Sequence, residues 1–470
     1  MPARSPTATE ALCAFSERLR FDRLPAEVAE KAKLLVLDIL GIALAARSTP
    51  IDAPLRGAAR ALMGAGGPGA ASAVGEREKV PPAVAALLNG ALGHSLDYDD
   101  THTGSIIHTA APVVPAALAG AEEFGRSGGD FLRAVVAGFE AEIRIGLCAP
   151  GRFHERGFHM TSIAGTFGAA LAYGLLAGLE GRGLVSALGI SGSQASGLFE
   201  YLEDGSPVKA LHPGWAAHSG IAAASLARGG MGGPATVLEG RFGLLRSHLG
   251  EGAYDAALLT AGLGERWETL ATSFKPYPCG HVIHAFLDAA ARLQGREKFS
   301  AGEIEEAVCH ASKKTIYLTL EPAEGKLRPR SGYEGKFSLP YCLASIFVRG
   351  KCGVDEFTED AVRERSVLEV ASRVRYVPEE PPDHPRFLSG KVEVRLRDGR
   401  SFLEEERCQR GAPENPLSSA EIRAKFFDNA RRSLPADRGE ELAGLLGRAE
   451  ALENLDRVGA LLRQAEPLDA

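Results

Sequence analysis

The chain has 470 residues, of which 45% are hydrophobic and 24% are charged, and its formal net charge is -7. These totals are those of a globular protein with enough residues for two or three domains and a large core. The acidic balance, and the lack of a basic run or of a basic stripe interleaved with aromatic residues, argue against nucleic-acid binding.

Cysteine usage and the N-terminal segment indicate the compartment. The seven cysteines are scattered and form no C-x-x-C pair, which argues against a disulfide framework or a zinc ribbon and favours a reducing compartment. The first 25 residues contain no apolar signal-peptide core. An uncharged window at 160–179 has the length of a membrane span, but it is rich in Ala, Gly, Ser and Thr. We therefore expect a buried helix there, no membrane association and a cytoplasmic location.

The first part of the chain has the apolar spacing of packed helices. Pro25 and the pair at 81–82 stand where a first helical turn accepts proline. Small residues recur throughout and allow helix axes to approach closely. The predicted helices cover residues 25–47, 81–97, 111–128, 129–149 and 164–181.

Near residue 270 the pattern changes. Residues 372–380 and 391–406 alternate apolar and polar side chains, and Asp398-Gly399 predicts a hairpin in the second stretch. The segment 303–323 is expected to start as a helix and to continue as a strand. Helices are predicted at 336–350 and 358–372, between these strands.

The chain then returns to helix, with Ser418 or Ser419 as a possible N-cap. We expect a mainly α protein with a large helical domain over 1–268, a smaller α+β domain over 269–405, and a C-terminal segment, 406–470, that returns to the helical domain.

The most unusual stretch is "LDYDDTHTGSIIHTAAP", residues 96–112. It places Asp97, Asp99, Asp100, His102 and His108 between apolar segments. A metal site, a proton-transfer site and a solvated loop with helix-capping residues all fit this composition. The metal interpretation is the weakest, because the chain has no HExxH motif and no EF-hand spacing, and no metal is expected.

Three later segments also combine basic side chains with apolar surroundings. His154 and His159 precede a small-residue helix, whose free N–H groups suit a carboxylate. The other two segments carry Lys209 with His212 and His218, and Lys275 with His281 and His284. Taken singly, each lysine fits a surface residue and each histidine fits a core residue.

Common catalytic motifs are missing. The sequence has no G-x-S-x-G elbow, no P-loop and no G-x-G-x-x-G after a strand. Serine-hydrolase, NTPase and dinucleotide-binding functions therefore lose their main support.

Several blocks together resemble the MmgE/PrpD family. They are "GHSLDYDDTHTGSIIHTAAPVVPAALA", "GFHMTSIAGTFGAALA", "KALHPGWAAHSG", "FKPYPCGHVIHAFLDAA", "GKFSLPYCLA" and "GAPENPLSSAEIRAKF", in this order. The resemblance covers residues 10–460. It implies a helical domain built from both ends of the chain, an inserted α+β lid, a homodimer, an active site between the domains, and no metal or organic cofactor.

The resemblance also implies which residues form the site. The catalytic candidates are Asp97, His108, His159 and Lys209. The candidates for substrate binding are Thr101, Lys275, His281, His284 and Tyr341, and the choice between His281 and His284 stays open.

The family acts on small polycarboxylates by moving a proton beside a carboxylate. Histidine suits the base and acid roles, because its pKa of about 6.5 lies near working pH. Lys209 and helix N–H groups suit the stabilisation of negative charge, Asp97 is expected to orient a histidine, and Thr101 to bind a substrate carboxylate.

We expect a lyase, first of all a hydro-lyase resembling 2-methylcitrate dehydratase. A cis-aconitate-type decarboxylase or an iminodisuccinate-type epimerase is the alternative. A non-catalytic protein of the same fold that binds small acids is a distant third.

Overall fold

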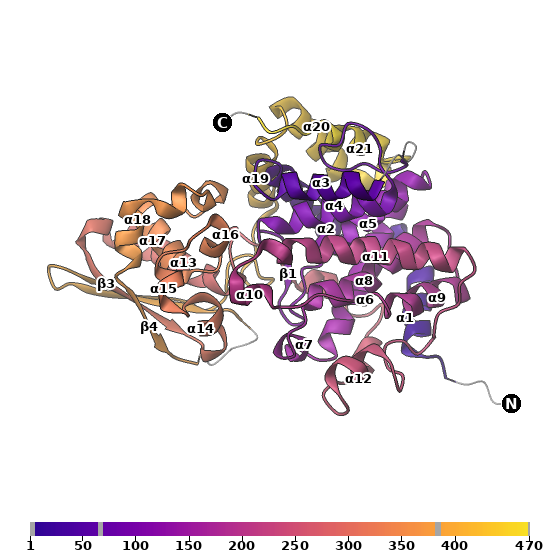
Figure 1. Cartoon of the computed structure of the whole chain (residues 1–470), viewed down its shortest axis with the longest axis horizontal. Helices are drawn as coiled ribbons and strands as arrows, with labels where there is room; N and C mark the ends of the chain where they lie inside the picture. Colours follow the sequence, from indigo (N-terminus) through magenta and orange to yellow (C-terminus); the bar gives the residue numbers. More distant parts are fainter. Residues whose placement is uncertain (1–4, 64–68, 381–386, 469–470) are drawn as a thin grey trace.

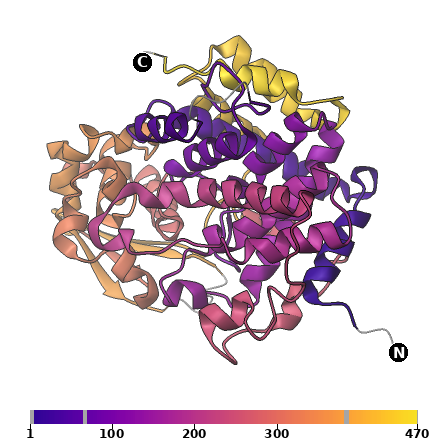
Figure 2. The same cartoon turned by 45° about the vertical axis from the view of Figure 1, so that its right-hand side comes forward.

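The computed structural model describes residues 5–63, 69–380 and 387–468. A large helical body holds both ends of the chain, and a smaller α+β part lies on one side of it, at the left in Figure 1. The turned view in Figure 2 shows the C-terminal helices packed on the first part of the chain. The fold is therefore mainly α with a small α+β part, as the sequence predicts.

The helical body is built from two stretches of sequence. The N-terminal stretch contributes α1 (Ala8–Arg18), α2 (Ala26–Ala46), α3 (Asp52–Met63), α4 (Pro82–Ser95), α5 (Ala110–Glu123), α6 (Gly128–Leu147), α7 (Arg152–Glu155), α8 (Met160–Leu176), α9 (Arg182–Ser191), α10 (Tyr201–Asp204), α11 (Leu211–Arg228) and α12 (Leu244–Leu249). The C-terminal stretch contributes α19 (Ser419–Ala430), α20 (Ala436–Gly447) and α21 (Asp456–Arg463). Ser418 caps α19 and forms a capping box with Glu421, which confirms the predicted start of this helix.

The α+β part has a four-stranded sheet with the order β4-β3-β5-β6. Its strands are β3 (Ile304–Ala311), β4 (Val374–Pro378), β5 (Gly390–Leu396) and β6 (Ser401–Glu406). Its helices are α13 (His284–Glu297), α14 (Lys313–Thr319), α15 (Ala323–Leu327), α16 (Gly332–Gly335), α17 (Leu339–Arg349) and α18 (Arg365–Ala371). β5 and β6 form the predicted hairpin, with Gly399 at φ +90° in its turn.

One predicted order was wrong. The segment 303–323 begins as the strand β3 and continues as the helix α14, the reverse of the expectation. Its Glu and Ala residues have helix propensity, but β3 is paired on both sides, parallel to β4 and antiparallel to β5. Sheet pairing at this interior position decides the conformation over local propensity.

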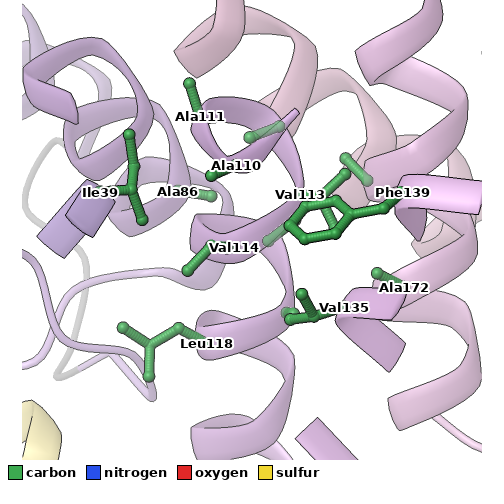
Figure 3. Packing of buried hydrophobic residues seen from close by; sticks show 14 of the residues in the cluster. Ile39, Ala86, Ala110, Ala111, Val113, Val114, Leu118, Val135, Phe139 and Ala172 are labelled. Atoms are coloured by element: carbon green, nitrogen blue, oxygen red, sulfur yellow. The ribbon is translucent and has the colours of Figure 1, made fainter. Parts of the chain in front are cut away.

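Buried apolar residues form two main clusters. The larger one joins residues 12–274 with residues 417–465, and the other covers residues 279–396. Figure 3 shows Val113 and Val114 of α5 among Ile39, Val135 and Phe139 of neighbouring helices. The two clusters support the predicted division at 268 and 405, although its boundaries stay a prediction. Within the described ranges, no helix is long and apolar enough to cross a bilayer.

Small residues let α4, α5 and α11 approach closely. A Cβ atom added to Gly214 of α11 would lie 2.2 Å from the carbonyl oxygen of Leu87 in α4, and one added to Gly90 would lie 2.8 Å from the Cα of Gly214. Such distances leave no room for a methyl group. α4 and α11 carry His94, His212 and the start of the Asp97 loop, so this close packing positions the site.

We predict that Gly214→Ala lowers the free energy of unfolding by about 1–3 kcal/mol, because the added methyl group meets backbone of α4. Urea denaturation followed by circular dichroism measures the change. Gly295→Ala is the matched control, since Gly295 lies on an exposed part of α13 with nothing within 4 Å of the added Cβ. It should raise stability by up to about 1 kcal/mol. Equal stability of Gly214→Ala and wild type would contradict the close-packing argument.

Candidate active site

The Asp-rich stretch forms a buried loop between α4 and α5. α4 ends at Ser95, and Asp97 then takes a left-handed conformation with φ +51°, which turns the chain sharply. The short strand β1 (Thr101–His102) pairs antiparallel with β2 (Thr272–Ser273) and fixes the far side of the loop. Asp97, Asp99, Asp100 and His102 are each at most 3% exposed.

The solvated-loop interpretation is therefore wrong for Asp99, Asp100 and His102. The capping interpretation holds for Asp100, whose carboxylate accepts from the N–H of Thr109 at 2.8 Å and of Ala110 at 3.0 Å, at the start of α5. His102 lies 2.9 Å from the hydroxyl of Ser105 and also contacts Glu268. These hydrogen bonds offset the cost of burying Asp100 and His102.

Asp97 pairs with two lysines from distant segments. Lys209 donates to its carboxylate, and Lys275 donates to its backbone oxygen at 2.9 Å and lies 3.4 Å from the carboxylate. Burial favours the neutral acid, but these two ammonium groups outweigh it and hold the pKa of Asp97 well below 3.8. Asp97 was expected to orient a histidine, and its hydrogen bonds go to lysines instead.

A third buried lysine joins this loop. Lys336, just after α16, donates to the carbonyl oxygen of Leu96 at 2.9 Å and of Pro278 at 3.0 Å. Burial lowers the pKa of Lys336 to about 8, against an opposing effect of Asp97. The neighbouring Phe337 ring lies 5.2 Å from Nζ of Lys209. Lys336 stands in the quoted block "GKFSLPYCLA", but a lone lysine there gives no sign of burial.

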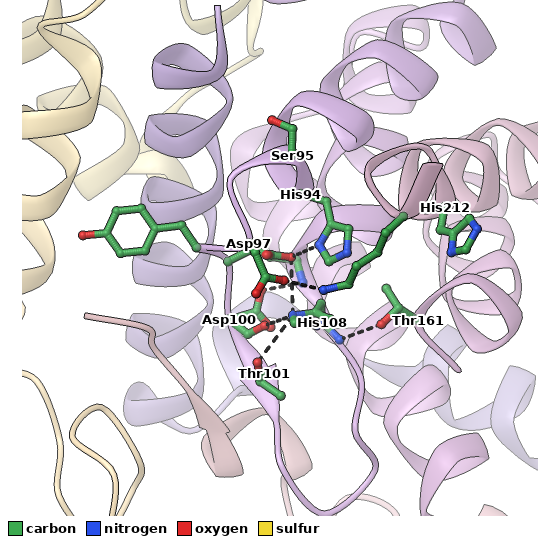
Figure 4. A network of polar contacts seen from close by, with 12 residues as sticks. His94, Ser95, Asp97, Asp100, Thr101, His108, Thr161 and His212 are labelled. Carbon is green, nitrogen blue, oxygen red and sulfur yellow. Dashed lines mark hydrogen bonds and ion pairs between the residues drawn. The ribbon is translucent and has the colours of Figure 1, made fainter. Parts of the chain in front are cut away.

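Histidines from four segments gather beside the lysines, and Figure 4 shows three of them, His94, His108 and His212. Nδ1 of His94 lies 2.7 Å from Asp99, and Nδ1 of His108 lies 2.8 Å from the backbone oxygen of Asp100. Nδ1 of His159 and of His212 are 2.9 Å apart. His94 was not predicted as a site residue, because its position in the helical pattern of α4 is that of a core residue. Its one signal was Asp99, five positions later.

These contacts fix tautomers. A carbonyl oxygen only accepts, so Nδ1 of His108 carries the proton that it shares with Asp100. Asp99 is ionised, because the adjacent histidines hold its pKa low against the effect of burial. Its carboxylate can only accept, so Nδ1 of His94 also carries a proton. When neutral, each of these rings has its lone pair on Nε2. Nε2 of His94 is buried without a hydrogen-bond partner.

Burial keeps the central histidines neutral. It lowers the pKa of His108 and His159 well below 6.5, and the lysines add to the effect. The pKa of His212 falls to about 4 for the same reasons. Neutral imidazoles can accept protons. One ring nitrogen each of His94, His108 and His159 lies within 4.8 Å of the others, so this is also where a metal ion would find ligands.

The remaining predicted residues fall into two groups. The hydroxyl of Thr101 lies 3.4 Å from Nδ1 of His108. His281 is buried without a hydrogen-bond partner, and burial, then His284 and Lys275, lower its pKa. His284 and Tyr341 point elsewhere. His284 binds the carbonyl oxygen of Cys279 at 3.1 Å, and Tyr341 is buried in the α+β part, where it donates to the backbone oxygen of Glu356.

Comparisons with known proteins identify the family of the chain. A model of the MmgE/PrpD N-terminal domain matches residues 10–257, and one of the MmgE/PrpD C-terminal domain matches residues 277–446. The chain belongs to the MmgE/PrpD family. The site described above takes residues from both matched regions, since Asp97 and Lys209 lie in the first and Lys336 in the second.

Curated relatives in this family align over most of their length. A cis-aconitate decarboxylase of Aspergillus terreus is 29% identical over 476 residues, which cover 97% of this chain and 95% of the relative. A human cis-aconitate decarboxylase is 31% identical over 405 residues, 83% of this chain and 81% of the relative. A mouse cis-aconitate decarboxylase is 27% identical over 476 residues, 97% and 93% respectively.

We predict that the protein loses stability as pH falls below about 6.5, the pKa of a histidine in the unfolded chain. The pKa of His212 in the folded protein is about 4. Between pH 4 and about 6.5 the unfolded chain therefore binds more protons than the folded one, and the free energy of unfolding falls as the pH falls through this window. His212→Gln should flatten the dependence by up to about 1.4 kcal/mol per pH unit. Melting temperatures at pH 7, 6 and 5 measure this. His218→Gln, outside the cluster, is the control, and an unchanged slope in His212→Gln would contradict the prediction.

Proposed function

We propose that the protein is a lyase that decarboxylates a small tricarboxylic acid of the cis-aconitate type. Membership of the MmgE/PrpD family supports a small carboxylic acid as substrate. The relatives reported above are cis-aconitate decarboxylases. They favour the decarboxylase alternative over the 2-methylcitrate dehydratase that the sequence alone placed first, and the dehydratase becomes the second candidate.

The observation that carries the proposal is the charge around Asp97. Lys209, Lys275 and Lys336 are all at most 7% exposed, and Asp97 is the carboxylate that they share. Buried ammonium groups are costly unless anions pair with them. An excess of buried positive charge at one loop therefore suits a ligand that brings several carboxylates.

Decarboxylation needs a place for an electron pair and a proton. When the bond between the saturated carbon and its carboxylate breaks, its electrons form a new double bond to the neighbouring carbon. The electrons of the former double bond then take a proton at the far carbon, and CO2 leaves. The remaining carboxylates stay on the lysines, which stabilise the developing negative charge.

His108 and His159 are the proposed proton donors. Both are neutral in the free protein, because burial and the lysines lower their pKa. A bound polyanion adds negative charge beside them and raises their pKa, so proton uptake accompanies binding. The bond between Nδ1 of His159 and of His212 orients His159 for this step.

Two further expectations stay predictions. The homodimer and the cytoplasmic location follow from the family resemblance and from the composition. The non-catalytic alternative is disfavoured by the gathering of predicted catalytic residues, Asp97, His108, His159 and Lys209, from separate segments in one buried cluster.

We predict that the protein releases CO2 from cis-aconitate and incorporates one deuterium into the product in deuterated buffer, as scored by NMR. 2-Methylcitrate should stay unchanged. Water loss from 2-methylcitrate without CO2 release from cis-aconitate would reinstate the dehydratase. Exchange of a proton without loss of either CO2 or water would indicate an epimerase, and inertness toward all the acids would contradict the lyase assignment.

We predict that His159→Ala and Lys209→Ala each reduce turnover at least about 100-fold, because one removes a proton donor and the other a charge-stabilising cation. Steady-state rates with cis-aconitate measure the loss, and circular dichroism checks that the variants are folded. His218→Ala and Lys313→Ala are matched controls, since both residues lie away from the Asp97 loop. A folded Lys209→Ala variant with near wild-type rates would contradict the role of this lysine as a charge-stabilising cation.

A further inference from the structure

Three buried histidines converge from three segments of the helical body. His94 lies on the last turn of α4, His108 precedes α5, and His159 stands directly before α8. The ring centroids of His94 and His108 are 4.7 Å apart, and that of His159 lies 5.8 Å from His94 and 6.2 Å from His108. Within the described ranges, these residues form a group of potential metal ligands, and the proposed reaction uses His108 and His159 as proton donors and not as ligands.

Each of these rings is already held through Nδ1. Asp99 holds His94, the backbone oxygen of Asp100 holds His108, and His212 holds His159. Histidines that bind metals in proteins characteristically donate their second N–H to a carboxylate or a carbonyl group, which orients the ring. The nitrogen of each ring that is not engaged in these contacts is Nε2, and in His94 this atom is buried without any partner.

The spacing needs little adjustment to hold an ion. One nitrogen of each ring lies within 4.8 Å of the others, so a central point is at most about 2.8 Å from each (4.8 Å divided by the square root of three). Zinc binds histidine nitrogen at about 2.0–2.1 Å. Ring movements of less than about 1 Å therefore complete three bonds.

The charge near the three histidines is mixed. Lys209 and Lys275 are positive, and the carboxylates of Asp97 and Asp99 offset part of that charge. The carboxylate of Asp99 lies 2.7 Å from Nδ1 of His94, so an ion bound by these rings would have an anion close by.

We propose that His94, His108 and His159 bind one divalent transition-metal ion of the zinc type through Nε2, leaving its fourth position open. The ion is not a cofactor of the proposed reaction. It binds His108 and His159, the proposed proton donors, so it competes with the carboxylic acid substrate and inhibits turnover. The binding site itself rests on geometry alone and stands whether or not the protein is a decarboxylase.

The test uses untagged full-length protein stripped of metal, in a Cys408→Ser background, because Cys408 is the partly exposed thiol among otherwise buried cysteines. Zn2+ is titrated by calorimetry, and Co2+ by its visible absorption, whose intensity distinguishes four-coordinate from six-coordinate ions. We expect one ion per chain and an intense, four-coordinate Co2+ spectrum. Removing a ligand in His94→Gln or His108→Gln should abolish both signals.

Two further variants separate ligation from folding. Asp99→Asn removes the carboxylate that orients His94 and lies 3.6 Å from Nδ1 of His108, while keeping all three ligands. Zn2+ affinity should therefore fall about 10–100-fold while binding persists. His218→Gln, at a half-buried position of α11 where the ring stacks on Trp215, should bind as wild type. No saturable Zn2+ binding by the wild-type protein, or equal binding by a folded His94→Gln variant, would overturn the proposal. Full activity at saturating Zn2+ would overturn the inhibitory part while leaving the site.

Discussion

The ion cluster around Asp97 is the interaction on which the rest of the site depends. Removing a carboxylate and several ammonium groups from water is costly, and the cost is recovered only when each charge faces an opposite charge or a hydrogen-bond partner. Asp97 meets this condition through Lys209 and Lys275, while Lys336 uses two backbone oxygens. Removing the carboxylate of Asp97 would leave the ammonium group of Lys209 buried without the anion that it pairs with.

The carboxylates of the same loop have separate tasks. Asp97 neutralises lysines, Asp99 orients His94, and Asp100 caps α5. Each task needs carboxylate oxygens at a different position, which explains why three aspartates occur within four residues. The left-handed backbone of Asp97 separates its side chain from the others by turning the chain at the end of α4.

Local pattern was sufficient to predict much of the fold. Helical spacing located α2, α4, α5, α6 and α8, Asp398-Gly399 located the hairpin, and Ser418 located the start of α19. The pattern failed for 303–323, where sheet pairing overrides helix propensity. These correct predictions share a cause, since each depends on residues that lie only a few positions apart in the sequence.

The site was predictable only in part, for the same physical reason. Residues in conspicuous polar motifs, such as Asp97, His108 and Lys209, were identified through a family resemblance. His94 and Lys336 were not, because a buried histidine in a helix and a single lysine in a loop look ordinary in sequence. The tertiary partners that give them their roles, Asp99 and the carbonyl oxygen of Leu96, are seen only in the fold.

The separation of the cluster residues along the chain has a consequence for folding. The contacts of Lys209 and Lys275 with Asp97, and of Lys336 with Leu96, join residues 112, 178 and 240 positions apart. Closing such long loops is entropically costly and slow compared with helix formation. The charges can leave water together only after the helical body and the α+β part have both formed and docked. A nascent or partly folded chain therefore has no assembled site, and the site forms only when folding is complete.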